Sequence, residues 1–413
     1  MEGFIDVVLK SSGVRRGLVD KSLLLVSLVN GIGFGFSWAV LAPYLRILGV
    51  SGSIFGLMSG GSVFVASFST LLAGILCDVY GSKRIASIGL VLYGLSFFLF
   101  STRLLHFIAM GYLLLGFSSS LVMTSINVLT SRSVDDSMLH YSFSYVRASR
   151  TLGSAAGSFL GWIPVILSMS LGIDLALAYG FSLLALTPIM IANVFLVARV
   201  RERSFERMGS PSLGEIFRGI RGLGRFNYLI VIGSLIGFGA AMSIHNIGYY
   251  FAAKYGVTSG EIGSIFGLQQ LAMAFIMTRL PVLADKYGGP LRIYLAATIP
   301  SIPLLIAMTL VDDYLAASTI YLVRSILMNV ANPLYTAFAL SLVPNSRRGI
   351  ASGLLSLSRQ LPAGAGRAIG GYLLDIDLEL PLRLTAILYT VSLVVLALLF
   401  EKEWRRKQLI ISA

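Results

Sequence analysis

Four arginines lie within long apolar runs of the sequence, where few neighbouring side chains can neutralise their charge: Arg150, Arg324, Arg359 and Arg367. A charge near the middle of a membrane-spanning helix costs about 2.5–3.5 kcal/mol, so such a residue faces a bundle interior or an aqueous cavity. Guanidinium groups bind carboxylate or phosphate through paired hydrogen bonds. We therefore expect a cavity that attracts an anion, such as an organic acid or a phosphorylated metabolite. Arg324, roughly 15 Å into its run at 1.5 Å per residue, is the arginine that we expect to face this anion.

The acidic residues support this expectation, because none of the 19 Asp and Glu lies near the centre of an apolar run. A structural role is the alternative for each arginine. Arg150 and Arg359 occupy corresponding positions of two similar segments, so backbone carbonyls or loop carboxylates are alternative partners for them. Arg147 and Arg279 lie closer to the ends of their runs, where a long basic side chain can extend toward water.

A polar cluster, His245-Asn246, interrupts another apolar run. A histidine inside a membrane can relay protons, and a neutral histidine bonded to a neighbour is the alternative. The coupling ion is accordingly a proton or a counter-anion, since exchange of two anions needs no proton carrier. Further polar side chains that we expect to line the cavity are Asn30, Trp38, Gln269, Gln270, Asn329 and Asn332.

Several classes of function are excluded by composition. The chain is 56% hydrophobic and only 12% charged, whereas about a quarter of the residues of a soluble domain are charged. Its single cysteine excludes a disulfide framework and a cysteine-based metal site. No nucleophile–base pair and no cofactor motif is found, since no strand precedes the glycine-rich segment 364–371. We expect no enzyme activity, no cofactor, no metal and no nucleic acid partner.

Apolar runs long enough to cross a bilayer predict an all-α integral membrane protein. A polar stretch at 199–226 separates six runs in residues 1–198 from six in residues 227–413, and its segment 212–223 is typical of an amphipathic helix on the membrane surface. The predicted spans are 22–47, 51–77, 85–103, 106–130, 141–168, 172–198, 227–251, 259–284, 291–311, 314–343, 349–373 and 381–400.

The distribution of basic residues predicts the orientation. Of the 32 Lys and Arg, 22 fall in the tails, the central stretch and the loops on one side, and four fall in the loops on the other. The positive-inside rule therefore places both termini in the cytoplasm, in a multi-pass protein of the plasma membrane. Residues 1–21 lack the features of a cleavable signal peptide, so we interpret the run at 22–47 as the first spanning helix.

A short polar segment between the second and third runs combines glycines, one acid and two basic residues: Gly74, Asp78, Gly81, Lys83 and Arg84. It predicts a tight turn in which Gly81 adopts a positive φ. The spacing resembles the signature that the major facilitator superfamily carries between its second and third helices, although Val79 stands where that signature is usually basic. The same pattern returns in the second half of the chain, at Asp285, Lys286 and Gly288.

Other segments also recur about 210 residues apart. The hexamer Gly-Ser-Ile-Phe-Gly-Leu occurs at 52–57 and at 263–268, and the segment from Arg150 resembles the one from Arg359. The resemblance implies two related six-helix halves that alternate in exposing a central site, and a unit that works as a monomer. It also implies that Asp78 docks near the start of the eleventh helix and holds one face closed. A carboxylate at a helix N-terminus gains about 0.3–1 kcal/mol.

Glycines spaced one helical turn apart predict close helix crossings. They are Gly153, Gly157 and Gly161 in the fifth span and Gly366 and Gly370 in the eleventh. The first set resembles an antiporter motif of the same superfamily, but Ser158 replaces the proline that follows the glycine in that motif.

The resemblance and the arginines together predict a secondary active transporter in the lipid bilayer, carrying a small solute that we expect to be an anion. A proton-coupled exporter of drugs or lipophiles with the same fold is the alternative, given the 24 Phe and 18 Tyr. A membrane receptor or scaffold without transport is a more remote alternative.

Overall fold

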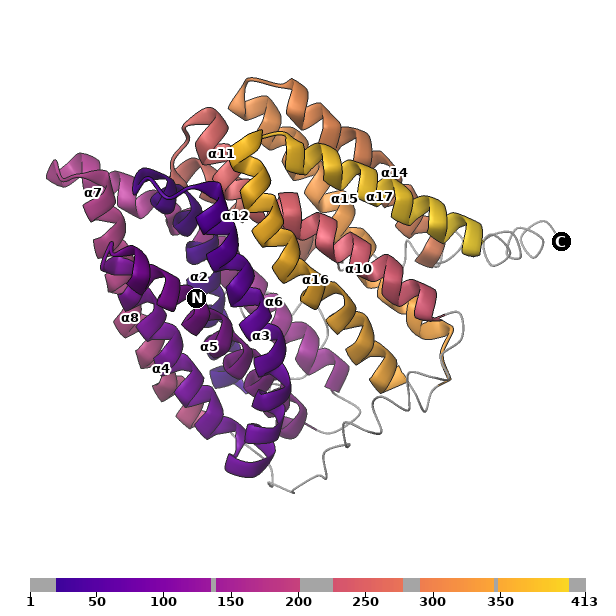
Figure 1. The fold of residues 1–413 in the computed structure, drawn as a ribbon. Coiled ribbons are helices and arrows are strands. Elements are labelled where there is room, and N and C mark those ends of the chain that lie inside the picture. Colours follow the sequence, from indigo (N-terminus) through magenta and orange to yellow (C-terminus); the bar gives the residue numbers. More distant parts are fainter. Residues whose placement is uncertain (1–19, 135–138, 201–225, 278–289, 345–347, 401–413) are drawn as a thin grey trace.

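The computed structural model describes residues 20–134, 139–200, 226–277, 290–344 and 348–400, which are helical and contain no strand (Figure 1). Serine and aspartate caps begin several helices by accepting a hydrogen bond from a free backbone amide of the first turn. Asp20, Ser51, Asp174 and Asp313 serve in this way. Gly81 has a φ of 90° between the second and third helices, as the turn required.

The first half consists of six spans. They are α2 (Lys21–Ile47), α3 (Gly52–Tyr80), α4 (Ser82–Ser101), α5 (Leu105–Ser133), α6 (Leu139–Phe159) continued by η2 (Leu160–Trp162) and α7 (Ile163–Leu171), and α8 (Leu175–Arg199).

The second half repeats this arrangement within the described residues. Its spans are α10 (Phe226–Ser243) continued by η3 (Ile244–Asn246) and α11 (Ile247–Tyr255), α12 (Ser259–Met277), α14 (Pro290–Ala307) with η4 (Met308–Leu310), α15 (Tyr314–Ser341), α16 (Arg348–Ile376) and α17 (Leu380–Leu399).

The twelve predicted spans are confirmed, with ends within about four residues wherever these ends are described. Ten of them are apolar and long enough to cross a membrane by length and composition alone. The other two, α12 and α16, carry polar side chains such as Gln269, Gln270, Arg359 and Arg367. Asp285, Lys286, Gly288 and the expected amphipathic segment 212–223 lie outside the described residues.

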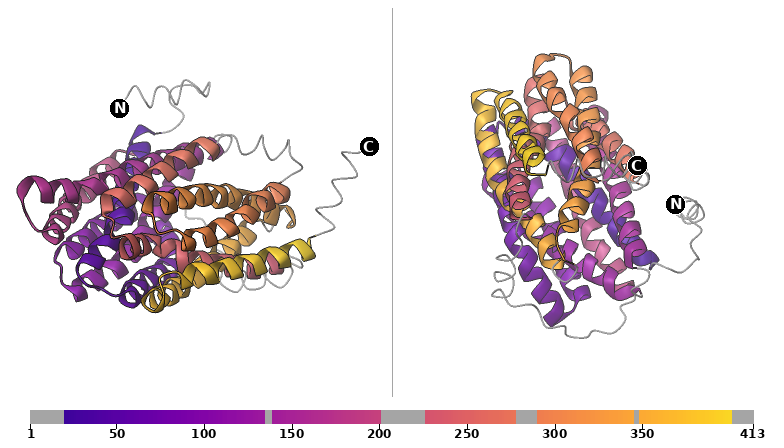
Figure 2. Two further views of the ribbon diagram at one scale, coloured as in Figure 1. Left: turned by 90° about the horizontal axis from the view of Figure 1, so that it is seen from above. Right: turned by 90° about the vertical axis from the view of Figure 1, so that its right-hand side faces the viewer.

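Three hydrophobic cores show how the halves meet. One core joins the halves, and it includes Leu45 and Phe55 of the first half with Phe251 and Leu374 of the second. At the opposite end of the bundle each half has a core of its own, around Leu129 in one half and Leu396 in the other. The halves are thus packed together at one end, which we call the closed end, and separate toward the other (Figures 1 and 2).

Glycine-lined crossings bring the first and fifth spans of each half into contact, whereas the sequence predicted close crossings without their partner helices. A Cβ at Gly153 or Gly157 would lie 2.0 or 2.1 Å from a backbone oxygen of α2. A Cβ at Gly366 or Gly370 would lie 2.5 or 1.9 Å from a backbone oxygen of α10. Gly161 faces α12 instead, with its Cβ position 2.5 Å from the Ser259 carbonyl, so it serves the contact between the halves.

Candidate functional site

Two cavities lie between the halves, and Phe34, Trp38, His245 and Phe266 border both of them. The larger has a volume of about 360 Å³ and is lined mainly by α2, α6, α12 and α15. The smaller has a volume of about 190 Å³ and extends among α2, α3, α4 and α5 of the first half. In the described part of the chain, neither cavity is lined by an Asp or a Glu.

Arg324 of α15, which the sequence analysis expected to face the solute, lines the larger cavity. The residue is only 2% exposed, and its guanidinium carbon lies 5.5 Å from the centre of the Tyr389 ring. Its Nε and Nη2 have no hydrogen-bond partner among the described residues. A buried guanidinium with unused donors beside a cavity is a ready site for an anion.

Neutral polar groups surround Arg324. Tyr321 donates a hydrogen bond to the Gln269 side-chain oxygen at 3.1 Å, which fixes both groups at the wall of the larger cavity. Asn329 also lines this cavity, but its Nδ2 donates to the Ser325 carbonyl at 2.8 Å.

A second cation, Arg147 of α6, lines the same cavity and is exposed. The larger cavity therefore combines two cations with side-chain amides and several hydroxyl groups.

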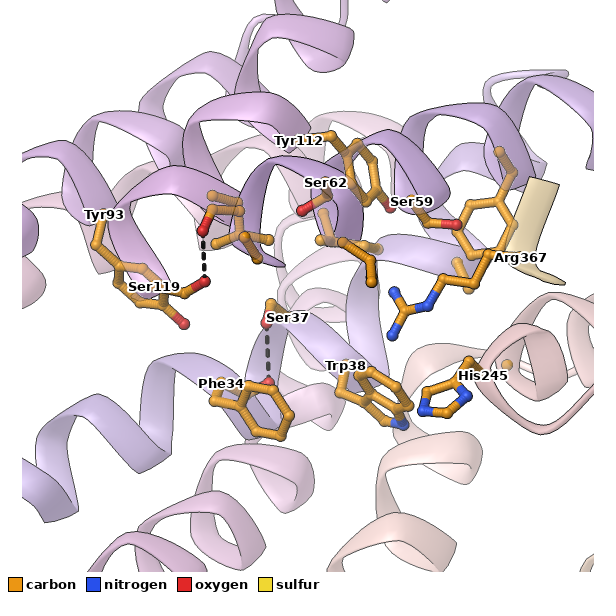
Figure 3. A pocket seen from close by; sticks show the side chains of 18 of the residues that line it. Phe34, Ser37, Trp38, Ser59, Ser62, Tyr93, Tyr112, Ser119, His245 and Arg367 are labelled. Carbon is orange, nitrogen blue, oxygen red and sulfur yellow. Dashed lines mark hydrogen bonds between the residues drawn. The ribbon is translucent and has the colours of Figure 1, made fainter. Parts of the chain in front are cut away.

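Arg367 enters the smaller cavity from α16 and is the only Lys, Arg, Asp or Glu in its described lining. Its guanidinium lies over the Trp38 ring, 5.6 Å from the ring centre (Figure 3). His245 meets the same indole edge-on at a centroid distance of 5.8 Å. The Nδ1 of His245 has no described partner, and the residue sits in η3, where the seventh span changes from α to 3₁₀ geometry.

Trp38 and His245 are 207 positions apart, the same shift that relates Asp78 to Asp285. Their contact is therefore made by corresponding residues of the first spans of the two halves. This position lies on the border shared by the two cavities, so the pseudo-symmetry axis passes near the candidate site.

Arg150 and Arg359 are not placed in the lining of either cavity. Each lies over an aromatic ring of its own half, Arg150 over Phe34 at 5.1 Å and Arg359 over Tyr335 at 4.7 Å. Arg359 also donates to the Asn332 side-chain oxygen at 3.1 Å. Their expected role in the cavity is thus not supported by this geometry, because the glycine crossings turn their segments toward α2 and α10.

Two asparagines expected in the cavity line neither one. Asn246 is 1% exposed and donates to the carbonyls of Met242 and Arg367, at 3.3 and 3.1 Å, so it joins η3 to α16. Asn30 is 4% exposed within α2.

The sequence analysis missed several lining residues: Ser37, Ser59, Ser62, Tyr93, Tyr112 and Tyr321. Serine and tyrosine are common throughout the apolar runs, and no periodic signal separates these residues from those that face lipid.

The side chains of the turn between α3 and α4 are bonded within the first half of the chain. Arg132 at the end of α5 donates from Nη2 to the Asp78 carboxylate at 3.0 Å and from Nη1 to the Ser82 hydroxyl at 3.0 Å. Lys83 and Arg84 begin α4 beside it. A Cβ at Gly74 would meet no atom within 4 Å, and nothing in the structure explains a glycine there. Docking of Asp78 on the eleventh helix stays a prediction for another state of the protein.

Comparisons with known proteins agree with this architecture. A family model described as Major Facilitator Superfamily matches residues 23–367 and 229–409. An uncharacterized MFS-type transporter of Methanocaldococcus jannaschii is 24% identical over 382 residues, covering 87% of this chain and 93% of that protein. The quinolone resistance protein NorA of Staphylococcus aureus is 24% identical over 383 residues, covering 91% and 94%.

Solved structures of the same fold include transporters for different solutes. The nucleoside transporter NupG superposes with a TM-score of 0.73 at 15% identity, covering 91% of this chain and 98% of NupG. A bacterial homolog of the human lysosomal transporter Spinster, inward-facing and occupied, has a TM-score of 0.75 at 13% identity, covering 92% and 96%. These likenesses concern the fold, and none of these relatives is an enzyme.

Proposed function

This chain belongs to the Major Facilitator Superfamily, and on that premise we propose that it is a secondary active transporter whose solute is an anion bound by Arg324. The observation that carries the proposal is the buried guanidinium of Arg324, which has two nitrogens without described partners in a cavity without described carboxylates. Burying a charge without a partner is costly, so a bound anion would stabilise this site strongly.

The unequal packing of the two ends supports a mechanism of alternating access. The halves share a core at the closed end and have separate cores at the other. The distribution of basic residues favours the closed end as the outer face, so this state is one that opens to the cytoplasm. A solute that binds this state and the outward-open state with different affinities shifts the equilibrium between them.

Two forms of coupling are compatible with the cavity lining. In the first form, His245 carries a proton, since it borders both cavities and contacts Trp38. Exchange of the solute for a second anion is the alternative, since both anions would use Arg324 in turn.

Thermal stability of the purified protein against a panel of solutes tests the anion proposal. A ligand that binds only the folded state raises stability by RT ln(1 + [L]/Kd). Carboxylates or organic phosphates are expected to stabilise the protein, and Arg324→Gln to abolish the effect. Arg359→Gln is the matched control, because it removes a helix-borne arginine that lines neither cavity. Anion binding that survives Arg324→Gln would contradict the proposal.

Export of lipophilic drugs is the second candidate. It is favoured by the aromatic lining of the smaller cavity and by the likeness to NorA. Stabilisation by lipophilic cations, unchanged by Arg324→Gln, would support it over anion transport. Uptake or extrusion of the stabilising solute by vesicles that contain the protein distinguishes both candidates from a receptor or scaffold.

A further inference from the structure

We propose that the two cavities form one bipartite site for an organic acid that carries a single aromatic ring. The acid group pairs with Arg324 in the larger cavity, and the ring enters the smaller cavity past Trp38. This inference rests on the anion proposal above and adds the class of anion.

The smaller cavity has an aromatic frame. Phe34, Trp38, Phe55 and Phe266 line it, and Phe34, Trp38 and Phe266 also border the larger cavity. A ligand that crosses this border therefore contacts aromatic side chains along its path. Flat aromatic groups pack favourably against such rings in offset or edge-on geometry.

The serines of the smaller cavity contribute less polarity than their number indicates. Ser37 donates to the Phe34 carbonyl at 2.8 Å, and Ser119 donates to the Gly116 carbonyl at 3.0 Å (Figure 3). Ser59 donates to the Gly56 carbonyl at 3.3 Å. Because each hydroxyl donates its one proton to its own helix, none of the three has a donor left for a ligand. An apolar group can enter without breaking these bonds.

The volume limits the size of the apolar group. An engineered apolar cavity of about 150 Å³ in another protein binds benzene. The 190 Å³ of the smaller cavity accordingly accommodates one six-membered ring.

Arg367 makes an aromatic group a better occupant than an aliphatic one. Its guanidinium already lies over Trp38, and in the close-up view it extends into the interior of the cavity (Figure 3). A ligand ring beside this cation gains a cation–π attraction that an alkyl chain of the same size lacks. The cation also disfavours a lipophilic cation in this cavity.

A series of acids tests the inference on the unaltered protein in detergent, with binding measured by thermal stabilisation. Phenylacetate is expected to bind at least tenfold more tightly than acetate, because its ring removes apolar surface from water and acetate has no such surface. The affinity for hexanoate should fall between those for acetate and phenylacetate. Phenylacetamide should bind weakly, since it lacks the charge that Arg324 requires.

Ala66→Phe fills the smaller cavity and supplies a second test, because Ala66 lines this cavity. It should lower the affinity for phenylacetate about tenfold, to that for acetate, and leave acetate binding unchanged. Ala192→Phe is the matched control, because Ala192 is exposed on α8. If Ala66→Phe does not fold, the acid series on the unaltered chain still decides.

The outcomes separate this inference from the anion proposal. If acetate, hexanoate and phenylacetate bind equally and all depend on Arg324, the anion proposal stands and the bipartite site is wrong. If a dicarboxylate without a ring binds most tightly and loses affinity in Arg367→Gln, Arg367 is a second anion ligand and the aromatic class is wrong. If no acid binds, the anion proposal itself fails.

Discussion

The closed end contains two copies of one hexamer, Gly52–Leu57 in α3 and Gly263–Leu268 in α12, and they meet different partners. Both copies use their glycines where the halves cross. A Cβ at Gly52 would lie 2.6 Å from the Gly371 carbonyl of α16, and a Cβ at Gly263 would lie 2.0 Å from the Ser158 carbonyl of α6. The duplicated sequence therefore forms the two contacts between the halves at this end, α3 with α16 and α12 with α6.

The difference between the copies comes from their position in the helix. The first copy begins α3, so its amides have no partner within the helix. The Asp375 carboxylate accepts from the amides of Gly52 and Ser53, at 2.7 and 2.8 Å. The second copy begins one turn inside α12, where its amides bond within the helix, and the Ser264 hydroxyl accepts from Trp162 Nε1 at 2.9 Å. The contact between α3 and α16 thus contains a charged group, Asp375, and we call it the latch. The contact of α12 with α6 and Trp162 is made by close packing and one neutral hydrogen bond.

The largest effect is expected from Gly263→Val, which places a branched side chain against the Ser158 carbonyl. Overpacking of this kind costs about 1–3 kcal/mol. The melting temperature should fall, and the fraction of protein with an open outer face should rise. Gly353→Ala is the control, since a Cβ there meets no atom within 4 Å. Equal stability of the two variants would show that α12 and α6 are loosely packed at Gly263.

Asp375→Asn is expected to have an intermediate effect, because it removes the charge of the latch and one acceptor oxygen. Asp375 is exposed, so solvent reduces the loss to about 1 kcal/mol, or roughly a fivefold shift of the equilibrium away from the closed outer face. A cysteine at Ser59, in a Cys77→Ser background, should react faster with an impermeant maleimide added from outside.

The control for the latch is Asp377→Asn. Asp377 lies two residues after Asp375 and pairs with Arg383 of its own half. It should leave the reaction rate of the cysteine unchanged. If the two variants behave alike, the effect is one of surface charge and the latch makes no special contribution.

The repeated arginines give a smaller contrast between the halves. Arg359→Met leaves the Asn332 oxygen without its donor, whereas Arg150 has no described side-chain hydrogen bond to lose. The first variant should therefore cost about 1 kcal/mol more than Arg150→Met in thermal unfolding. Adding Asn332→Ala should remove most of that difference in a double-mutant cycle. If the difference in stability persists, it comes from the contact of Arg359 with the Tyr335 ring and not from the hydrogen bond to Asn332.

Trp162→Phe is expected to have the smallest effect. Phenylalanine retains a ring against Gly260 and loses only the hydrogen bond to Ser264, worth about 0.5–1 kcal/mol. Ser264→Ala should give a similar loss, and the double variant little more than either alone. Fully additive losses would show that the two side chains act independently.

Much of the fold could be predicted from the sequence because bilayer chemistry acts on local composition. Length and hydropathy located the spans, and the turn at Gly81 and the glycine crossings at Gly153 and Gly370 followed from local rules about φ and helix spacing. The burial of Arg324 could be predicted in the same way, since a deep arginine must face inward.

The partners of the polar residues were decided only by the tertiary structure. Arg150 and Arg324 are alike by local composition, yet Arg150 lies over Phe34 and lines neither cavity, whereas Arg324 lies over Tyr389 and lines the larger cavity. The two hexamers are identical in sequence, yet one meets Asp375 and the other Trp162. Local sequence sets which groups must leave the lipid, whereas the rotation of each helix and the angle between the halves set which groups they meet.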